Sequence, residues 1–177
     1  MTPEIKLSIW NFVVDNLSSK FTNKIYWANE RKDEPEKPFC LLRAIVPEQT
    51  TSRTSEQEIS KNVQEVTMYK NCVVTISIFV DGLEEVGDLD EQNAFAEKSA
   101  RDLKNTFETI DTAWVLNAEG LSVDYISDLR DLTTAVSGGY SYRYEFDVTF
   151  GYNEVMLIQK EVGKDVNLQI ERKTLND

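Results

Sequence analysis

The clearest pattern in the chain is a strict alternation of apolar and polar residues between Tyr140 and Tyr152. Tyrosine, phenylalanine and valine occupy every even position, while small or charged residues occupy every odd position. A repeat of two residues is typical of a β-strand with one buried and one polar face. At about 3.4 Å per residue, this strand would extend over roughly 40 Å, which is longer than most strands.

Two further β-rich runs, Val63–Tyr69 and Cys72–Val80, precede it in the chain. They are either two strands joined near Lys70-Asn71 or one long bent strand, which Asp81-Gly82 ends. One face of the second run would be formed by Cys72, Val74, Ile76, Ile78 and Val80. Shorter strands are predicted at Lys24–Ala28, at Phe39–Val46, which Pro47 ends, and at Leu121–Ile126.

Two segments show helical spacing of apolar residues. The first helix begins at Thr2-Pro3-Glu4, where threonine caps, proline takes the first position and glutamate meets the positive dipole end. Its apolar stripe is Ile5, Ile9, Val13 and Leu17, broadened by Leu7, Trp10, Val14 and Phe21. The second helix, Ala94–Thr109, repeats apolar residues at steps of three and four: Ala96, Ala100, Leu103, Phe107 and Ile110.

Polar segments separate these elements. Asn29–Pro38 is almost wholly charged and reads as an exposed loop. Glu48–Asn62 has Ile59 as its single large apolar residue, so we expect it to be mobile unless a partner orders it. Ser127–Gly139 is predicted as a further loop, which Gly138-Gly139 breaks.

The C-terminal segment is predicted to form a β-hairpin. Glu154–Val162 and Asp165–Arg172 flank Gly163-Lys164, whose leading glycine suits a type II′ turn. In that register Leu157 lies opposite Ile170. A hairpin that follows a complete core is often an arm that pairs with another surface.

Together these elements predict an α+β fold in a single domain. The sheet would be mixed or antiparallel and flanked by about two main helices, with a C-terminal β-hairpin arm. We expect residues 1–153 to form the domain and residues 154–177 to form an arm packed on it or on a neighbouring subunit. The length of 177 residues is appropriate for one core.

Composition excludes several kinds of function. The chain has 31 acidic and 19 basic residues, a formal net charge of −12, and no histidine. This balance opposes non-specific nucleic-acid binding, and the missing imidazole removes serine–histidine and cysteine–histidine relays. Cys40 and Cys72 fit no zinc spacing and are expected to be buried free thiols. No apolar run is long enough for a membrane span.

Candidate chemistry is correspondingly sparse. The acidic segment Asp81–Glu91 invites a calcium hypothesis, but the positions that need glycine and the final glutamate do not match the EF-hand loop. No glycine-rich phosphate loop occurs. A nucleic-acid stacking role for the tyrosine-rich strand would need interleaved basic residues, so a core role is favoured. We therefore expect no catalytic residue, no cofactor and no metal.

Two segments carry a resemblance to a known family. One is the run from Asn71 to Gly82 together with the amphipathic helix that follows. The other is the strand from Tyr142 to Tyr152, which matches the pattern R-x-x-x-D-V-x-F-x-Y at Arg143, Asp147, Val148, Phe150 and Tyr152. Over roughly Ile5 to Tyr152, the chain resembles the phage neck and tail terminator family, which includes lambda tail-terminator-like folds.

The resemblance implies a structural virion protein located in the tail or neck, and in the host cytoplasm during assembly. It implies a homohexameric ring that caps the head-proximal end of the tail tube and joins it to the neck. The implied partners are sister copies, the tail tube protein and neck or connector proteins, with the sheath protein as a further candidate. DNA would pass through the ring without specific binding, and no membrane is involved.

An acidic channel would repel phosphate, and candidate residues for it can be named. The candidates for a DNA-repelling lumen or a subunit interface are Asp81, Glu84, Glu85, Asp88, Asp90, Glu91, Arg143, Glu145 and Asp147. The alternatives left open are a head–tail connector or tail-completion protein of similar architecture, and a small acidic binding module. An enzyme is disfavoured because acid–base and nucleophile sets are missing.

Overall fold

The structure is a computed structural model that describes residues 1–29, 33, 35–60, 63–83, 88–159 and 172–173. The helices are α1 (Pro3–Asn16), the short 3-10 helix η1 (Ser19–Phe21), α2 (Leu89–Phe107) and α3 (Ile110–Ala118). The strands are β1 (Ile25–Trp27), β2 (Phe39–Ser60), β3 (Val63–Leu83), β4 (Leu121–Ile126), β5 (Arg130–Asp131), β6 (Thr134–Val136), β7 (Gly139–Gln159) and β8 (Arg172–Lys173). The predicted α+β fold class is confirmed.

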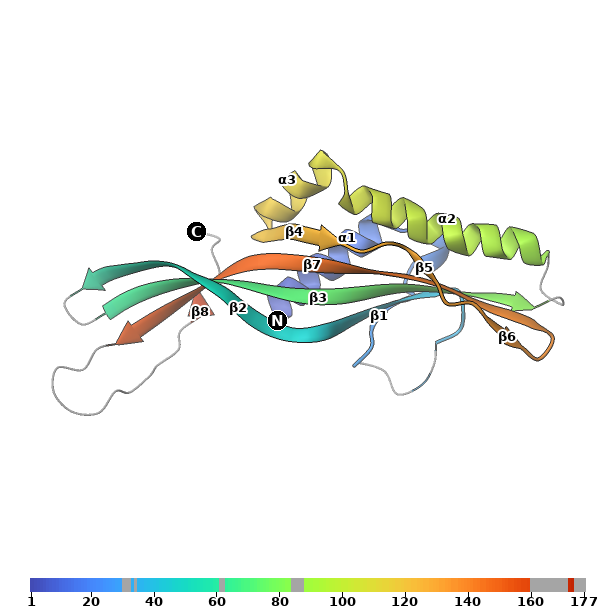
Figure 1. The fold of residues 1–177 in the computed structure, drawn as a ribbon, viewed down its shortest axis with the longest axis horizontal. Coiled ribbons are helices and arrows are strands. Elements are labelled where there is room, and N and C mark those ends of the chain that lie inside the picture. The colour runs from blue at the N-terminus through green and yellow to red at the C-terminus, as the bar shows by residue number, and fades with distance from the viewer. Residues whose placement is uncertain (30–32, 34, 61–62, 84–87, 160–171, 174–177) are drawn as a thin grey trace.

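All described strands belong to one mixed sheet with the order β1-β2-β3-β7-β4. β1 pairs with β2 in parallel, and the other described pairings are antiparallel. β3 and β7 pair without a register shift along their whole length, from Val63↔Gln159 to Leu83↔Gly139. The short strands β6, β5, β4 and β8 follow one another along the other edge of β7. Figure 1 shows the resulting long, twisted sheet with the helices gathered beside one part of it.

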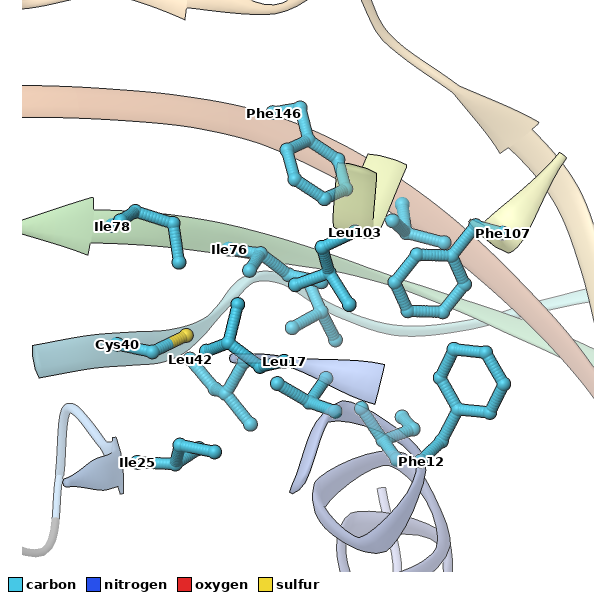
Figure 2. Packing of buried hydrophobic residues seen from close by; sticks show 14 of the residues in the cluster. Phe12, Leu17, Ile25, Cys40, Leu42, Ile76, Ile78, Leu103, Phe107 and Phe146 are labelled. Carbon is cyan, nitrogen blue, oxygen red and sulfur yellow. The ribbon is translucent and has the colours of Figure 1, made fainter. Parts of the chain in front are cut away.

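The hydrophobic core lies between the helices and one face of this sheet. The alternation predicted for β3 and β7 is confirmed, since Ile76 pairs with Phe146 and both are fully buried. α2 places Leu103 and Phe107 against this face, and Phe12 of α1 packs on Phe107 with 4.7 Å between ring centroids. Figure 2 shows these side chains converging from α1, α2 and the strands.

Tyr142, Tyr144 and Tyr152 of β7 are buried in the core, as the composition of the strand favoured, whereas Tyr140 is exposed. The Tyr142 hydroxyl donates to the Leu89 carbonyl at 3.1 Å, and the Tyr144 hydroxyl donates to Asn93 Oδ1 at 2.8 Å. Both acceptors belong to α2. The aromatic face therefore packs against a helix, and that helix accepts hydrogen bonds from the hydroxyl groups of Tyr142 and Tyr144.

Capping residues set where the helices begin. Thr2 Oγ1 accepts from the Ile5 amide at 3.4 Å, which confirms the predicted start of α1. α2 begins earlier than predicted because Asp88 accepts from the amides of Asp90 and Glu91. α3 was not predicted. Thr109 caps it, so Ile110 begins a new helix where the apolar spacing had suggested the end of the second one.

Three strand boundaries were wrong. Pro47 does not end a strand, because β2 continues to Ser60 through the polar segment that we expected to be mobile. β3 extends past Asp81-Gly82 to Leu83, while its continuity from Val63 confirms one of the two alternatives left open, a single long strand. The predicted loop Ser127–Gly139 contains the short strands β5 and β6, which pair with β7.

The C-terminal hairpin prediction falls largely outside the described residues, including Gly163-Lys164 and the pair Leu157–Ile170. The described part shows that β7 is continuous across position 153 and reaches Gln159. β8 pairs with it through Met156↔Arg172 and Val155↔Lys173.

Candidate functional site

The sheet extends well beyond the helices as a projection, hereafter the strand extension, formed by residues 49–60 of β2, 63–71 of β3 and 153–159 of β7, with the short strand β8 paired to its β7 part. Figure 1 shows it at the left-hand end of the sheet, away from α1, α2 and α3. No member of the hydrophobic core cluster lies in these stretches of the described chain. At about 3.4 Å per residue, the part from β3 alone spans roughly 30 Å. Val66 and Val155 are buried in the strand extension but do not belong to that cluster.

The outer edge of β2 is irregular along the strand extension. Beyond the short pairing with β1, the register between β2 and β3 shifts five times, the last two shifts lying between Arg53/Ser55 and Glu58/Ser60. Bulges bend a strand and interrupt its row of exposed amide and carbonyl groups. The edge is therefore poorly suited to indiscriminate pairing with another strand.

Ion pairs organise the polar face of the sheet, opposite the core, around Arg130 of β5. The Arg130 guanidinium donates to Asp147 Oδ2 at 2.8 Å and to Glu145 Oε1 at 3.2 Å. Thr75 Oγ1 donates to Asp147 Oδ1 at 2.8 Å, and Ser77 Oγ donates to Glu145 Oε2 at 3.0 Å. These contacts link β3, β7 and β5 in cross-strand rows.

This network is well shielded from solvent although it lies on the polar side. Ser77 is only 1% exposed, and Glu145 is buried beneath Arg143, which donates to Glu145 Oε2 at 2.7 Å. Burial alone would raise the pKa of Asp147, but hydrogen bonds from Arg130 and Thr75 outweigh it, so the pKa lies below its ordinary value. The charges of Glu145 and Asp147 are thus compensated within one subunit.

A glycine allows a second cross-strand contact on the same face. Tyr69 of β3 lies across Gly151 of β7, and its hydroxyl reaches both carboxylate oxygens of Asp124 on β4 at 2.7 Å. A Cβ atom at Gly151 would stand 1.7 Å from the Tyr69 hydroxyl oxygen. Only glycine leaves room for the ring, which ties the base of the strand extension to the opposite edge of the sheet.

The acidic segment lies at the other end of the sheet, where part of it has clear structural roles. Asp81 forms an ion pair with Lys37 at 3.2 Å. Asp88 is the N-cap of α2, and Asp90 and Glu91 lie in its first turn, where the helix dipole favours negative charge. Glu84 and Glu85 lie outside the described residues.

The structure thus separates the predicted site residues into two groups. Asp81, Asp88 and Glu91 line one surface depression together with Lys20 and Lys37. Arg143, Glu145 and Asp147 lie in the ion-pair network on the polar face of β7. Sequence reasoning missed Arg130. The signal that could have revealed it is the spacing of Glu145 and Asp147, since two carboxylates on one face of a strand favour a cation opposite them.

Other features of the described residues point to no reactive centre. No group of histidine, cysteine, aspartate and glutamate in the described chain is arranged to hold a metal ion. Cys40 and Cys72 are buried free thiols, as predicted, and burial raises the pKa of Cys40. Among the described residues, no helix combines the length and apolarity needed to cross a membrane.

A comparison with family models finds one whose description is "phage neck terminator protein", matched by residues 7–174. No curated protein matches the chain. The matched range includes the core, the whole strand extension and β8, and is wider than the segment on which the sequence resemblance was based. The chain therefore belongs to the phage neck terminator protein family and has a structural role in the phage neck.

Proposed function

We propose that this protein forms a homohexameric ring that closes the head-proximal end of the tail tube and joins it to the neck or connector. The family match over residues 7–174 carries this proposal. Its partners would be sister copies, the tube protein and neck proteins, with the sheath protein as a further candidate. The protein would assemble in the host cytoplasm and act without catalysis.

The strand extension is our candidate for the contact between adjacent subunits. A closed ring needs a head-to-tail interface, in which one surface of a subunit meets a different surface of its neighbour. A projection that lies outside the core can reach a neighbour without disturbing the fold. We include residues 154–159 of β7 in this arm, as the described part of the predicted C-terminal arm.

Shortening the strand extension tests this assignment. Ser52 and Tyr69 are register partners, so Arg53–Met68 can be replaced by Asn-Gly, which favours a tight hairpin turn. All members of the core cluster and the Tyr69–Asp124 contact are retained. We expect a folded protein by circular dichroism that no longer forms rings, measured by native mass spectrometry, or sediments with tail tubes.

The opposite end of the sheet offers a matched control. Thr134 and Ser141 are register partners in the β6–β7 hairpin, so Ala135–Tyr140 can be replaced by Asn-Gly in the same way. This variant should still assemble. Rings of normal size from the shortened strand extension would exclude it as the subunit contact, while leaving the family assignment untouched.

The second part of the proposal concerns the channel for DNA. Glu145 and Asp147 are paired with Arg130 and Arg143, and Asp81 is paired with Lys37, so these carboxylates contribute little net charge. Asp90 and Glu91 are exposed at the start of α2, next to Asp88. We assign these three carboxylates, which form no ion pair with another residue of the described chain, to the DNA-facing surface, where they would repel phosphate.

Reversal of charge at this surface should slow DNA passage. Phage carrying Asp90→Lys with Glu91→Lys should eject DNA more slowly than wild type, because lysines bind phosphate and release counterions. The control is Glu36→Lys with Asp128→Lys, which makes the same change in net charge at exposed positions elsewhere. Ejection kinetics identical to wild type in the first variant would discard this surface as the channel lining.

A further inference from the structure

A groove runs between α1 and α3 on the outer side of the helical layer. Its volume is 590 Å³, and residues of α1, of α3 and of the C-terminal end of α2 line it. Phe12 and Leu116 are buried at its base, while Val115 is 56% exposed at its rim. Ser8 of α1 donates to Glu119 Oε2 at 3.2 Å, which fixes the two helices relative to each other. The groove is large enough to hold side chains from a partner.

All the charged side chains that line the groove are acidic. Asp15, Asp111 and Glu119 line it, and no lysine or arginine does. None of the three carboxylates forms an ion pair with a residue of the described chain. The groove therefore concentrates negative charge that this part of the molecule does not neutralise.

The placement of two of these carboxylates is unfavourable for the helices themselves. Asp15 lies in the last turn of α1, and Glu119 is the C-cap residue of α3. Both positions are at the negative end of a helix dipole, where a cation is favoured, and neither helix has a basic residue in its last turn. Helix stability does not explain these two acids, whereas a bound cation would be stabilised by both dipole and carboxylate.

Exposed apolar side chains occur on the two helices that line the groove. On α3, Trp114 is 72% exposed and is followed by Val115 at the groove rim. On α1, Leu7 and Val14 are exposed as well, and they lie two helical turns apart on one side of the helix. A fold that needed only solubility would place polar residues at these outward positions. Exposed apolar side chains, aromatic ones above all, can serve as anchors in protein interfaces, and charge complementarity adds specificity.

We propose that this groove docks a segment of another virion protein that carries a lysine or arginine beside an apolar side chain. A second copy of this chain is a poor occupant, because its net charge is −12 and the cations of α2 are already paired with Glu97, Asp102 and Glu108. This inference rests on the proposed function, since it takes the partner from the tail or the neck.

Binding to particles that lack this protein tests the groove. Purified tails and purified heads from a deletion phage are the two probes, and co-sedimentation is measured between about 0.05 M and 0.5 M NaCl. The double variant Asp111→Asn with Glu119→Gln keeps the shapes of both side chains and removes their two negative charges. We expect binding to one probe to weaken about tenfold at low salt and to lose most of its salt dependence.

Matched variants decide the outcome. Glu36→Gln with Asp128→Asn removes two exposed carboxylates outside the groove and should bind within about twofold of wild type. Equal binding by the groove variant and wild type to both probes would overturn the inference and leave the proposed function standing. Equal weakening in both variants would also overturn it, because net charge alone would then explain the loss. Wild-type protein that binds neither probe would refute the proposed function itself.

Discussion

Replacing Phe107 by alanine is expected to lower the free energy of unfolding by about 4 kcal/mol, within the range for large aromatic deletions in a core. Phe107 packs on Phe12 of α1 and on both Phe146 and Phe150 of β7, with centroid distances of 4.7, 6.2 and 5.9 Å. It is a side chain of α2 that contacts both α1 and β7 within the core cluster. Chemical denaturation followed by circular dichroism measures the loss.

Trp114 provides the control for this prediction. It is an aromatic residue on the helix that follows, but it is exposed, so Trp114→Ala should change stability by less than about 0.5 kcal/mol. Similar losses from the two substitutions would mean that Phe107 does not join α1, α2 and β7 in one core.

The second large effect is expected from Arg130→Met, which should destabilise the protein by about 2 kcal/mol at pH 7. Removal of one partner costs about 3–5 kcal/mol in a buried ion pair and at most about 1 kcal/mol in an exposed one. An intermediate value applies because the Arg130 side chain is 41% exposed whereas its two carboxylate partners are largely buried. The substitution leaves Glu145 and Asp147 close together without their shared cation. Arg101→Met, which removes an exposed pair on α2, should cost at most about 0.5 kcal/mol.

The effect of Arg130→Met should depend on pH in a definite direction. The pKa of Asp147 is lowered in the folded state, so its ionisation contributes stability above the unfolded pKa of about 3.9. That contribution is lost as the pH falls through the lowered folded value. The difference between wild type and variant should therefore shrink on acidification below about pH 4. A difference that is constant from neutral to acidic pH would contradict the proposed role of the ion pair.

The parts of the fold that follow from local patterns could be predicted from the sequence. The alternation of β7 identified its buried face because one strand face packs on helices along the core, as the burial of Phe146 and Phe150 shows. The start of α1 could be predicted because its capping depends only on Thr2, Pro3 and the first helical turn. These signals depend on a few neighbouring residues, and tertiary structure did not override them.

The strand extension could not be predicted because its pairing is not local. The polar composition of Gln49–Ser60 gave no apolar alternation, yet β3 supplies a partner for it across a hairpin. Pro47 is tolerated because it lies where the register shifts between Val46 and Gln49, on a strand with an open outer edge. A bulge of this kind depends on the paired strand and leaves no clear mark in the sequence.

The sequence predicted only part of the arrangement on the polar face of β7. Alternation placed Glu145 and Asp147 on it correctly, but it did not indicate that Glu145 would be buried. Arg130 makes this burial possible, since it approaches from a short strand about fifteen residues earlier and completes the hydrogen bonds. Some candidate lumen carboxylates therefore have their charge neutralised by a paired arginine or lysine, and others do not. The number of acidic residues in the sequence does not reveal this difference.

Electron cryomicroscopy of purified tails mixed with this protein tests the central claim most directly. The account predicts a sixfold ring at the head-proximal end of the tube, with the strand extension of each subunit lying on its neighbour. Protein bound along the tube, located only on finished heads, or absent from both ends of the tail would contradict it.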